Sequence, residues 1–141
     1  MNNKGFTLIE VIIILSLLGI LLAISVPKVT TDFGYMDKKA EEFLADARFI
    51  QMEAMKYSKS KYQITVNSNE RKYYLRDEYK VIKTVNFKDR YNIKYTGTGS
   101  LYFNYEGTPI HPGTFSIFDS KTNKTISVTI VPTTGRTIIL E

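Results

Sequence analysis

One carboxylate, Glu10, lies inside an otherwise apolar run from Phe6 to Val26. As an α-helix this run would be about 32 Å long, at 1.5 Å per residue, which is enough to cross the hydrocarbon of a bilayer. A carboxylate within a membrane helix costs about 2.5–3.5 kcal/mol, so an acid kept there is expected to have a partner. The run contains no basic residue. Glu10 therefore indicates an ion pair with a group from outside its own segment.

Side chains suited to catalysis are scarce. The single histidine, His111, lies in a proline-rich turn from Thr108 to Gly113. The absence of cysteine excludes a thiol nucleophile, a cysteinyl zinc site and a disulfide. No glycine-rich phosphate loop, pair of carboxylates on a shared face or metal-ligand spacing is found. We therefore expect a protein that is not an enzyme and that uses no cofactor and no metal.

Three interpretations of the apolar run are open. A cleaved secretory signal could end at Ala23-Ile24-Ser25, but its apolar core would be shorter. A signal anchor accounts for the length and places Lys4 on the cytoplasmic side, but it gives Glu10 no role. The third interpretation accounts for Glu10. The segment Lys4-Gly5-Phe6-Thr7-Leu8-Ile9-Glu10 resembles the class III signal of type IV prepilins and pseudopilins.

This resemblance implies how the chain is processed and what it meets. A prepilin peptidase in the membrane would cut after Gly5 and methylate the new amino terminus at Phe6. Glu10 would then be the fifth residue, where the family uses a glutamate to neutralise the amino terminus of a neighbouring subunit. Other pilin subunits, an assembly platform protein and its ATPase are the further implied partners. The chain would be a single-pass membrane protein of a bacterium before assembly, and afterwards part of a filament outside the cytoplasm or at the cell surface.

Two residues weaken the end of the predicted membrane helix. Pro27 lacks the amide that would bond to the carbonyl of Ala23. Gly19 costs about 1 kcal/mol relative to alanine in a helix interior. The resemblance to type IV pilins implies that the interval from Gly19 to Pro27 melts inside the filament.

A helical period continues beyond Pro27 on an amphipathic segment. Its apolar residues are spaced alternately three and four apart: Phe33, Met36, Ala40, Phe43, Ala47, Ile50, Ala54 and Tyr57. We expect residues 27–58 to continue the helix of residues 6–26 and to pack this stripe on a sheet, although Gly34 could bend or cap the helix. A coiled coil is the alternative interpretation of the stripe.

From residue 59 the apolar period changes to two, which predicts strands. The expected strands are Tyr62–Val66 and Lys72–Arg76 as a hairpin, then Tyr79–Phe87, Ile93–Thr96, Leu101–Tyr105, Thr114–Phe118, Thr125–Val131 and Arg136–Leu140. The last three are separated by turns and are expected to form an antiparallel meander.

The carboxyl-terminal region supports a second, softer resemblance. Phe103, Gly107 and the pair Gly135-Arg136 are similar to positions in the H-type minor pseudopilins of type II secretion and in FimT-like minor pilins. Some FimT-like pilins that take up DNA carry a second arginine shortly after this pair. Here Thr137-Ile138 follows, so the resemblance to that binding feature is half complete.

Basic residues are concentrated between Lys56 and Lys94, where eleven lysines and arginines stand against four acids. Solvated strand faces and turns are one interpretation of this stretch. The other is a surface that binds a polyanion such as DNA or a cell-wall polymer, because clustered positive charge concentrates such partners. The candidate residues for that surface are Lys59, Lys61, Arg71, Lys72, Arg76, Lys80, Lys83 and Arg136.

The sequence thus predicts an α+β protein with a long amino-terminal helix packed on a small antiparallel β-sheet head. Its parts would be a cleaved leader (1–5), a membrane and assembly helix (6–26), an amphipathic continuation (27–58) and a β-rich pilin head (59–141). We expect a structural subunit, a minor pilin or pseudopilin, of a type IV pilus, type II secretion or competence filament. The alternative is a filament-borne subunit that captures DNA or another anionic polymer.

Overall fold

The computed structural model describes residues 7–25, 34–57 and 60–140. The chain divides into two compact units, Met1–Phe33 and Gly34–Glu141. The second unit is called the head below. Each unit is described by itself.

The first unit contains one helix, α1 (Leu8–Ser25). Its polar groups bond locally: the hydroxyl of Ser16 donates to the carbonyl of Ile12 at 2.7 Å, within the same helix. A serine that bonds back in this way leaves no unsatisfied hydroxyl among the apolar side chains.

The head begins with the amphipathic helix α2 (Tyr35–Lys56). Gly34 precedes it with a left-handed φ of 67°, a conformation that glycine adopts without the steric cost of a side chain. The helix ends at Tyr57, whose extended backbone still donates its N–H to the carbonyl of Glu53. The predicted helix of residues 27–58 is therefore observed from Tyr35. Its predicted continuity with the membrane helix falls on residues 26–33, outside the described residues.

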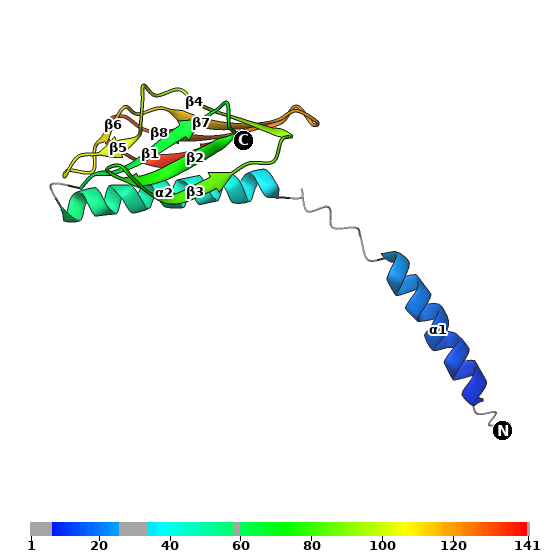
Figure 1. The fold of residues 1–141 in the computed structure, drawn as a ribbon. Helices are drawn as coiled ribbons and strands as arrows, with labels where there is room; N and C mark the ends of the chain where they lie inside the picture. Colours follow the sequence, from blue (N-terminus) through cyan, green and yellow to red (C-terminus); the bar gives the residue numbers. More distant parts are fainter. Residues whose placement is uncertain (1–6, 26–33, 58–59, 141) are drawn as a thin grey trace. The chain divides into compact units, whose positions relative to one another are not determined.

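The described part of the head contains nine strands in three antiparallel sheets, which lie on one side of α2 (Figure 1). The first has the order β1-β2-β3 and the second the order β4-β7-β8-β9, while β5 and β6 form a small third sheet. The bounds are β1 Tyr62–Asn67, β2 Lys72–Asp77, β3 Lys80–Asn86, β4 Tyr91–Tyr95, β5 Tyr102–Phe103, β6 Pro109–Ile110, β7 Thr114–Asp119, β8 Thr125–Ile130 and β9 Thr137–Leu140.

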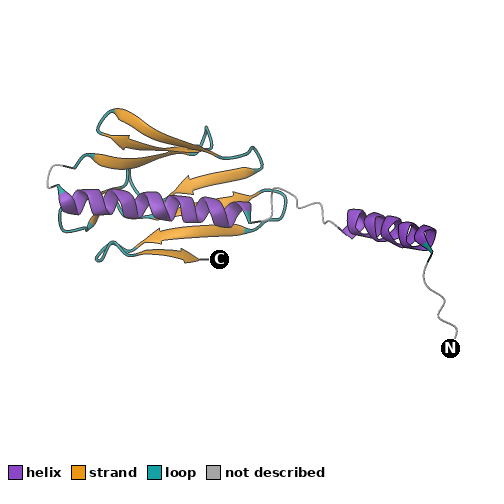
Figure 2. Ribbon diagram, turned by 90° about the horizontal axis from the view of Figure 1, so that it is seen from below, coloured by secondary structure: helices purple, strands orange, loops and turns teal. Residues whose placement is uncertain are grey.

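Helix α2 lies against the strands, runs in nearly the same direction as they do, and buries its apolar stripe against the sheets (Figure 2). Phe43 stacks on Phe115 of the interior strand β7, with ring centroids 4.0 Å apart, and meets Tyr73 of β2 edge-on at 5.4 Å. One helical residue thereby joins the two larger sheets. The buried stripe residues are Met36, Ala40, Phe43, Ala47, Ile50 and Ala54.

This packing confirms the predicted α+β class and the interpretation of the stripe as a core helix face rather than a coiled coil. The prediction that Tyr57 ends the stripe is wrong, because its side chain is 65% exposed where the chain turns away from the helix. Phe33 lies outside the described residues.

The strand predictions hold for the hairpin, for the strand that follows it and for the carboxyl-terminal meander, but they fail in the segment between β4 and β7. The predicted strand Leu101–Tyr105 is reduced to Tyr102–Phe103, and the unpredicted strand β6 pairs with it. Leu101 instead forms a single bridge with Ile64 of β1. The reason is non-local: β4 pairs with β7, so the segment between them is excluded from the second sheet and folds on itself.

Candidate functional site

The side chain of Glu10 lies in the first turn of α1 and bonds to Thr7. Its Oε2 accepts hydrogen bonds from the backbone N–H and the hydroxyl of Thr7, both at 3.1 Å. In return the N–H of Glu10 donates to the hydroxyl of Thr7 at 3.3 Å. This reciprocal pair is a capping box, which satisfies donors left free at a helix start. Its sequence signal, threonine followed three residues later by glutamate, was missed in the sequence analysis.

The capping box leaves part of Glu10 available. Only Oε2 is engaged by the described residues, and the side chain is exposed. Oε1 can therefore accept a further hydrogen bond from an ammonium group without breaking the cap.

The described side chains of α1, from Leu8 to Leu21, are all exposed, although nearly all are apolar. A helix that is apolar on every side is stable in water only when other apolar surface covers it. Within the described residues, no helix qualifies by length and apolarity as a membrane span. The predicted span of residues 6–26 begins and ends outside the described residues and stays a prediction.

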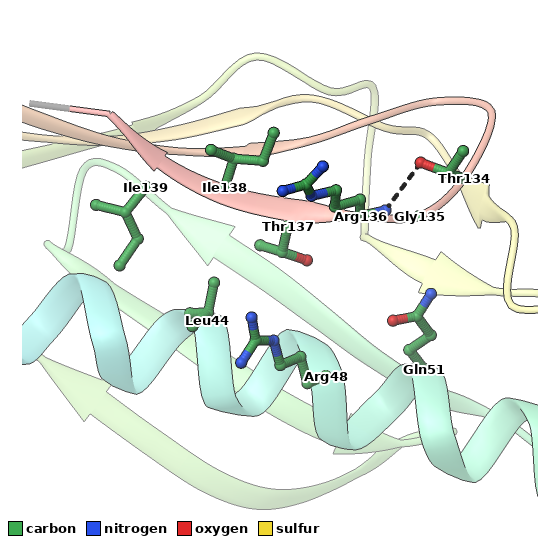
Figure 3. A pocket seen from close by; sticks show the side chains of 9 residues that line it. All are labelled: Leu44, Arg48, Gln51, Thr134, Gly135, Arg136, Thr137, Ile138 and Ile139. Atoms are coloured by element: carbon green, nitrogen blue, oxygen red, sulfur yellow. Dashed lines mark hydrogen bonds between the residues drawn. The ribbon is translucent and has the colours of Figure 1, made fainter.

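A second candidate site is an open pocket of ≈ 500 Å³ in the head (Figure 3). One wall consists of Leu44, Arg48 and Gln51 from α2, and the other of residues 134–139, which cover the end of the β8–β9 turn and β9. Neither Arg48 nor Arg136 has an ion pair or a side-chain hydrogen bond with another described residue. Both side chains are exposed. The pocket therefore presents two unneutralised guanidinium groups.

The turn beside this pocket is held by close backbone packing. Gly135 has a φ of 63°, and a Cβ there would lie 2.4 Å from the carbonyl oxygen of Gly107. The same carbonyl accepts a hydrogen bond of 2.8 Å from Nε2 of Gln51, and the ring of Phe103 lies 3.3 Å from the same Cβ position. Phe103, Gly107 and Gly135, which carried the resemblance of the carboxyl-terminal region, are thus brought together around Gln51.

Comparisons with known proteins find similarity to this chain both in sequence and in fold. Residues 1–26 match the family described as the prokaryotic N-terminal methylation motif. Over 54 residues the chain is 44% identical to the competence protein ComGC of Bacillus subtilis (strain 168), a match that covers 38% of this chain and 55% of ComGC. The chain therefore spans about half the length of this curated relative.

The fold is similar to that of the minor pseudopilin EpsH from the type 2 secretion system of Vibrio cholerae. The TM-score is 0.60 at 16% sequence identity, and the match covers 74% of this chain and 95% of that chain. The chain thus combines an amino-terminal segment that matches the N-terminal methylation motif with a pilin-like fold.

Several predicted sites fall outside the described residues: Gly5 and Phe6 at the expected cleavage point, Pro27, and Lys59. Gly19 lies within α1, and a Cβ there would meet no atom within 4 Å. Its expected role in helix melting stays a prediction.

Much of the positive charge predicted for a polyanion site in the head is neutralised locally. Ion pairs join Lys61 to Glu78 and Lys72 to Glu70, and Arg71 lies 3.0 Å from Asp89. Paired charges create a weaker field at a distance than free ones. Three other candidate residues for the polyanion site have different surroundings. Lys83 contacts acids of α2, Arg76 lies over the ring of Tyr74, and Lys80 is exposed.

A buried polar cluster in the head was not predicted. Asp46 of α2 is 9% exposed and accepts hydrogen bonds from the hydroxyl of Tyr73 at 2.7 Å and from Nζ of Lys83 at 2.8 Å. Lys83 also lies 3.0 Å from Glu42. Partial burial disfavours the charged form of Lys83, but its bonds to Asp46 and Glu42 outweigh this effect and raise the pKa of Lys83. Burial and the bond to Asp46 raise the pKa of Tyr73.

Proposed function

We propose that this chain is a minor subunit of a filament built by a pilus, type II secretion or competence apparatus. The observation that carries the proposal is α1, whose exposed apolar surface carries one acid and which lies within the matched methylation motif of residues 1–26. Such a surface needs cover, and neighbouring helices of the same kind provide it in a filament. The similarity of the fold to a minor pseudopilin supports the minor role.

In this proposal the peptidase cuts after Gly5, and Phe6 becomes the methylated amino terminus. Glu10 then meets the amino terminus of a neighbouring subunit through Oε1, while Oε2 keeps the cap with Thr7. The pair forms where water is scarce, so its attraction is stronger than in solution. Contacts of this head-to-tail kind propagate into a helical polymer.

The test is quantitative mass spectrometry of filaments sheared from the source bacterium. We expect an amino-terminal peptide that begins with methylated Phe6, and a small share of this chain in the total pilin. A Gly5→Val variant should remain uncut and be absent from filaments. Filaments that contain the chain with an intact Met1, or with a start near Val26, would contradict the proposal; a dominant share would make the chain a major subunit.

The alternative function, capture of a polyanion by the basic stretch, has less support. Lys61, Arg71 and Lys72 already have acidic partners in the head. A polyanion would have to displace carboxylates that are held by the same chain. The polyanion site stays a prediction, and retention of the protein on DNA at low salt, lost steeply as salt rises, is the measurement that supports it.

A further inference from the structure

Strand β9 has an edge that no described strand covers. It is the last strand in the order β4-β7-β8-β9, and in Figure 2 the strand that leads to the carboxyl terminus lies at the outer margin of the head. The other edge of β9 pairs with β8, with Ile130 opposite Thr137 and Thr129 opposite Ile138.

The register shows which backbone groups lie at this free edge. The N–H of Val131 donates to the carbonyl of Arg136 at 2.9 Å, which places these two residues at the position of a hydrogen-bonded pair, although the carbonyl of Val131 accepts from the N–H of Gly135. Such pairs alternate along an antiparallel ladder. Ile138 therefore bonds to β8, whereas the N–H and C=O groups of Thr137 and Ile139 face away from it. No hydrogen bond to these outward groups is found among the described residues.

The pocket of Figure 3 lies along this edge and carries its positive charge. Arg48 stands on the α2 side and Arg136 at the start of the strand, and neither has an acidic partner among the described residues. A guanidinium presents a fork of donors that matches a carboxylate. The edge thus combines unpaired backbone groups with two groups that bind acids.

A charged residue on an edge strand also has a protective role, since it discourages strands from other molecules. This role does not account for Arg48, which belongs to the helix. The two guanidinium groups also restrict the possible partner, because they attract carboxylates and repel basic side chains. The charges therefore favour an acidic strand.

We propose that the free edge of β9 binds an extended polypeptide segment with acidic side chains, by adding it as a further strand. Backbone groups of Thr137 and Ile139 pair with the segment, and Arg48 and Arg136 bind its carboxylates. The proposal goes beyond the filament function, which concerns α1, and its failure would leave that function untouched.

The test uses the full chain in detergent micelles and a fluorescent peptide of alternating threonine and glutamate, with binding followed by fluorescence anisotropy. The double variant Arg48→Gln/Arg136→Gln should weaken binding about tenfold or more, because it removes two charge-assisted contacts. The matched control, Lys94→Gln/Lys124→Gln, removes the same charge from exposed positions that do not line the pocket. It should change the affinity by less than about twofold in physiological salt.

Three further probes separate the proposed mode from its competitors. A threonine–lysine peptide should not bind, and an acidic peptide N-methylated at alternate residues should bind at least about tenfold more weakly, because it lacks the backbone donors that strand addition needs. A short oligothymidylate should compete poorly. Absent binding of the acidic peptide, equal binding of the N-methylated or lysine peptide, stronger binding of oligothymidylate, or equal losses in the arginine and lysine variants would each overturn the proposal.

Discussion

The hydroxyl of Tyr73 donates a hydrogen bond of 2.7 Å to Oδ2 of Asp46 in the interior of the head. The two residues are 27 positions apart, on β2 and α2. Lys83 of β3 binds the same carboxylate from the solvent side. This carboxylate therefore ties the first sheet to the helix at one defined register, because a buried acid is stable only where its partners meet it.

Replacing the Asp46 carboxylate should destabilise the head. In Asp46→Ala the Tyr73 hydroxyl is left buried without its acceptor, which should lower the free energy of unfolding by about 1–3 kcal/mol. Urea unfolding followed by circular dichroism measures the change. Glu41→Ala is the control, since Glu41 is exposed on the same helix and should change stability by less than about 0.5 kcal/mol. Similar losses in the two variants would show that the Tyr73–Asp46 bond contributes nothing.

Two substitutions separate the two roles of Glu10. Glu10→Gln keeps the capping box, because glutamine also serves at this position, but it removes the charge. We expect normal helix content by circular dichroism in micelles and at least about tenfold lower incorporation into filaments beside the wild-type subunit, since charge-assisted hydrogen bonds contribute about 1.5–3 kcal/mol. Glu10→Ala should lose both the cap and incorporation. Incorporation of Glu10→Gln at the level of the wild-type subunit would show that Glu10 serves only in the capping box.

The Gly135→Ala variant should be more destabilised than Gly99→Ala. Both glycines have positive φ, 63° and 82°, so each alanine carries a backbone strain of about 1–2 kcal/mol. A Cβ at Gly135 also meets the carbonyl of Gly107 at 2.4 Å, whereas a Cβ at Gly99 meets nothing within 4 Å. Thermal unfolding should show a further loss of about 1–3 kcal/mol for Gly135→Ala, because overpacking is added to strain. Equal losses would mean that the contact relaxes freely.

Asp119 should make the head sensitive to acid. The guanidinium of Arg90, with the hydroxyl of Thr122 and the N–H of Lys121, holds the pKa of this carboxyl well below its ordinary value of about 3.9. A lowered folded-state pKa contributes stability above the unfolded pKa that is lost as pH falls through the folded one. Asp119→Asn should therefore melt below the wild type at pH 7, and the difference should shrink below about pH 4. A difference independent of pH would contradict this origin.

Local patterns made much of the head predictable. The stripe from Met36 to Ala54 and the alternation in the carboxyl-terminal meander are short-range signals, and the structure uses both. The capping box of Thr7 and Glu10 was equally local and could have been read in the same way.

Pairings between distant residues were not predictable from one sequence. Asp46 stands one residue before a stripe alanine, and nothing near it in the chain indicates that Tyr73 and Lys83 will meet it. Arg48 and Arg136 come together only because β9 is placed beside α2. The charge count over the basic stretch suggested a polyanion surface, but it contained no information on which lysines find acids on neighbouring strands.

The aromatic stack of Phe43 on Phe115 has a mechanical consequence. It lies near the middle of a buried stripe that runs along most of α2. Tension applied to the amino-terminal end of the helix therefore loads this whole stripe in shear, and many side chains must slide past the sheets together before the helix is released. Resistance of this kind suits a protein that is pulled along its own axis, and it requires no covalent cross-link in a chain without cysteine.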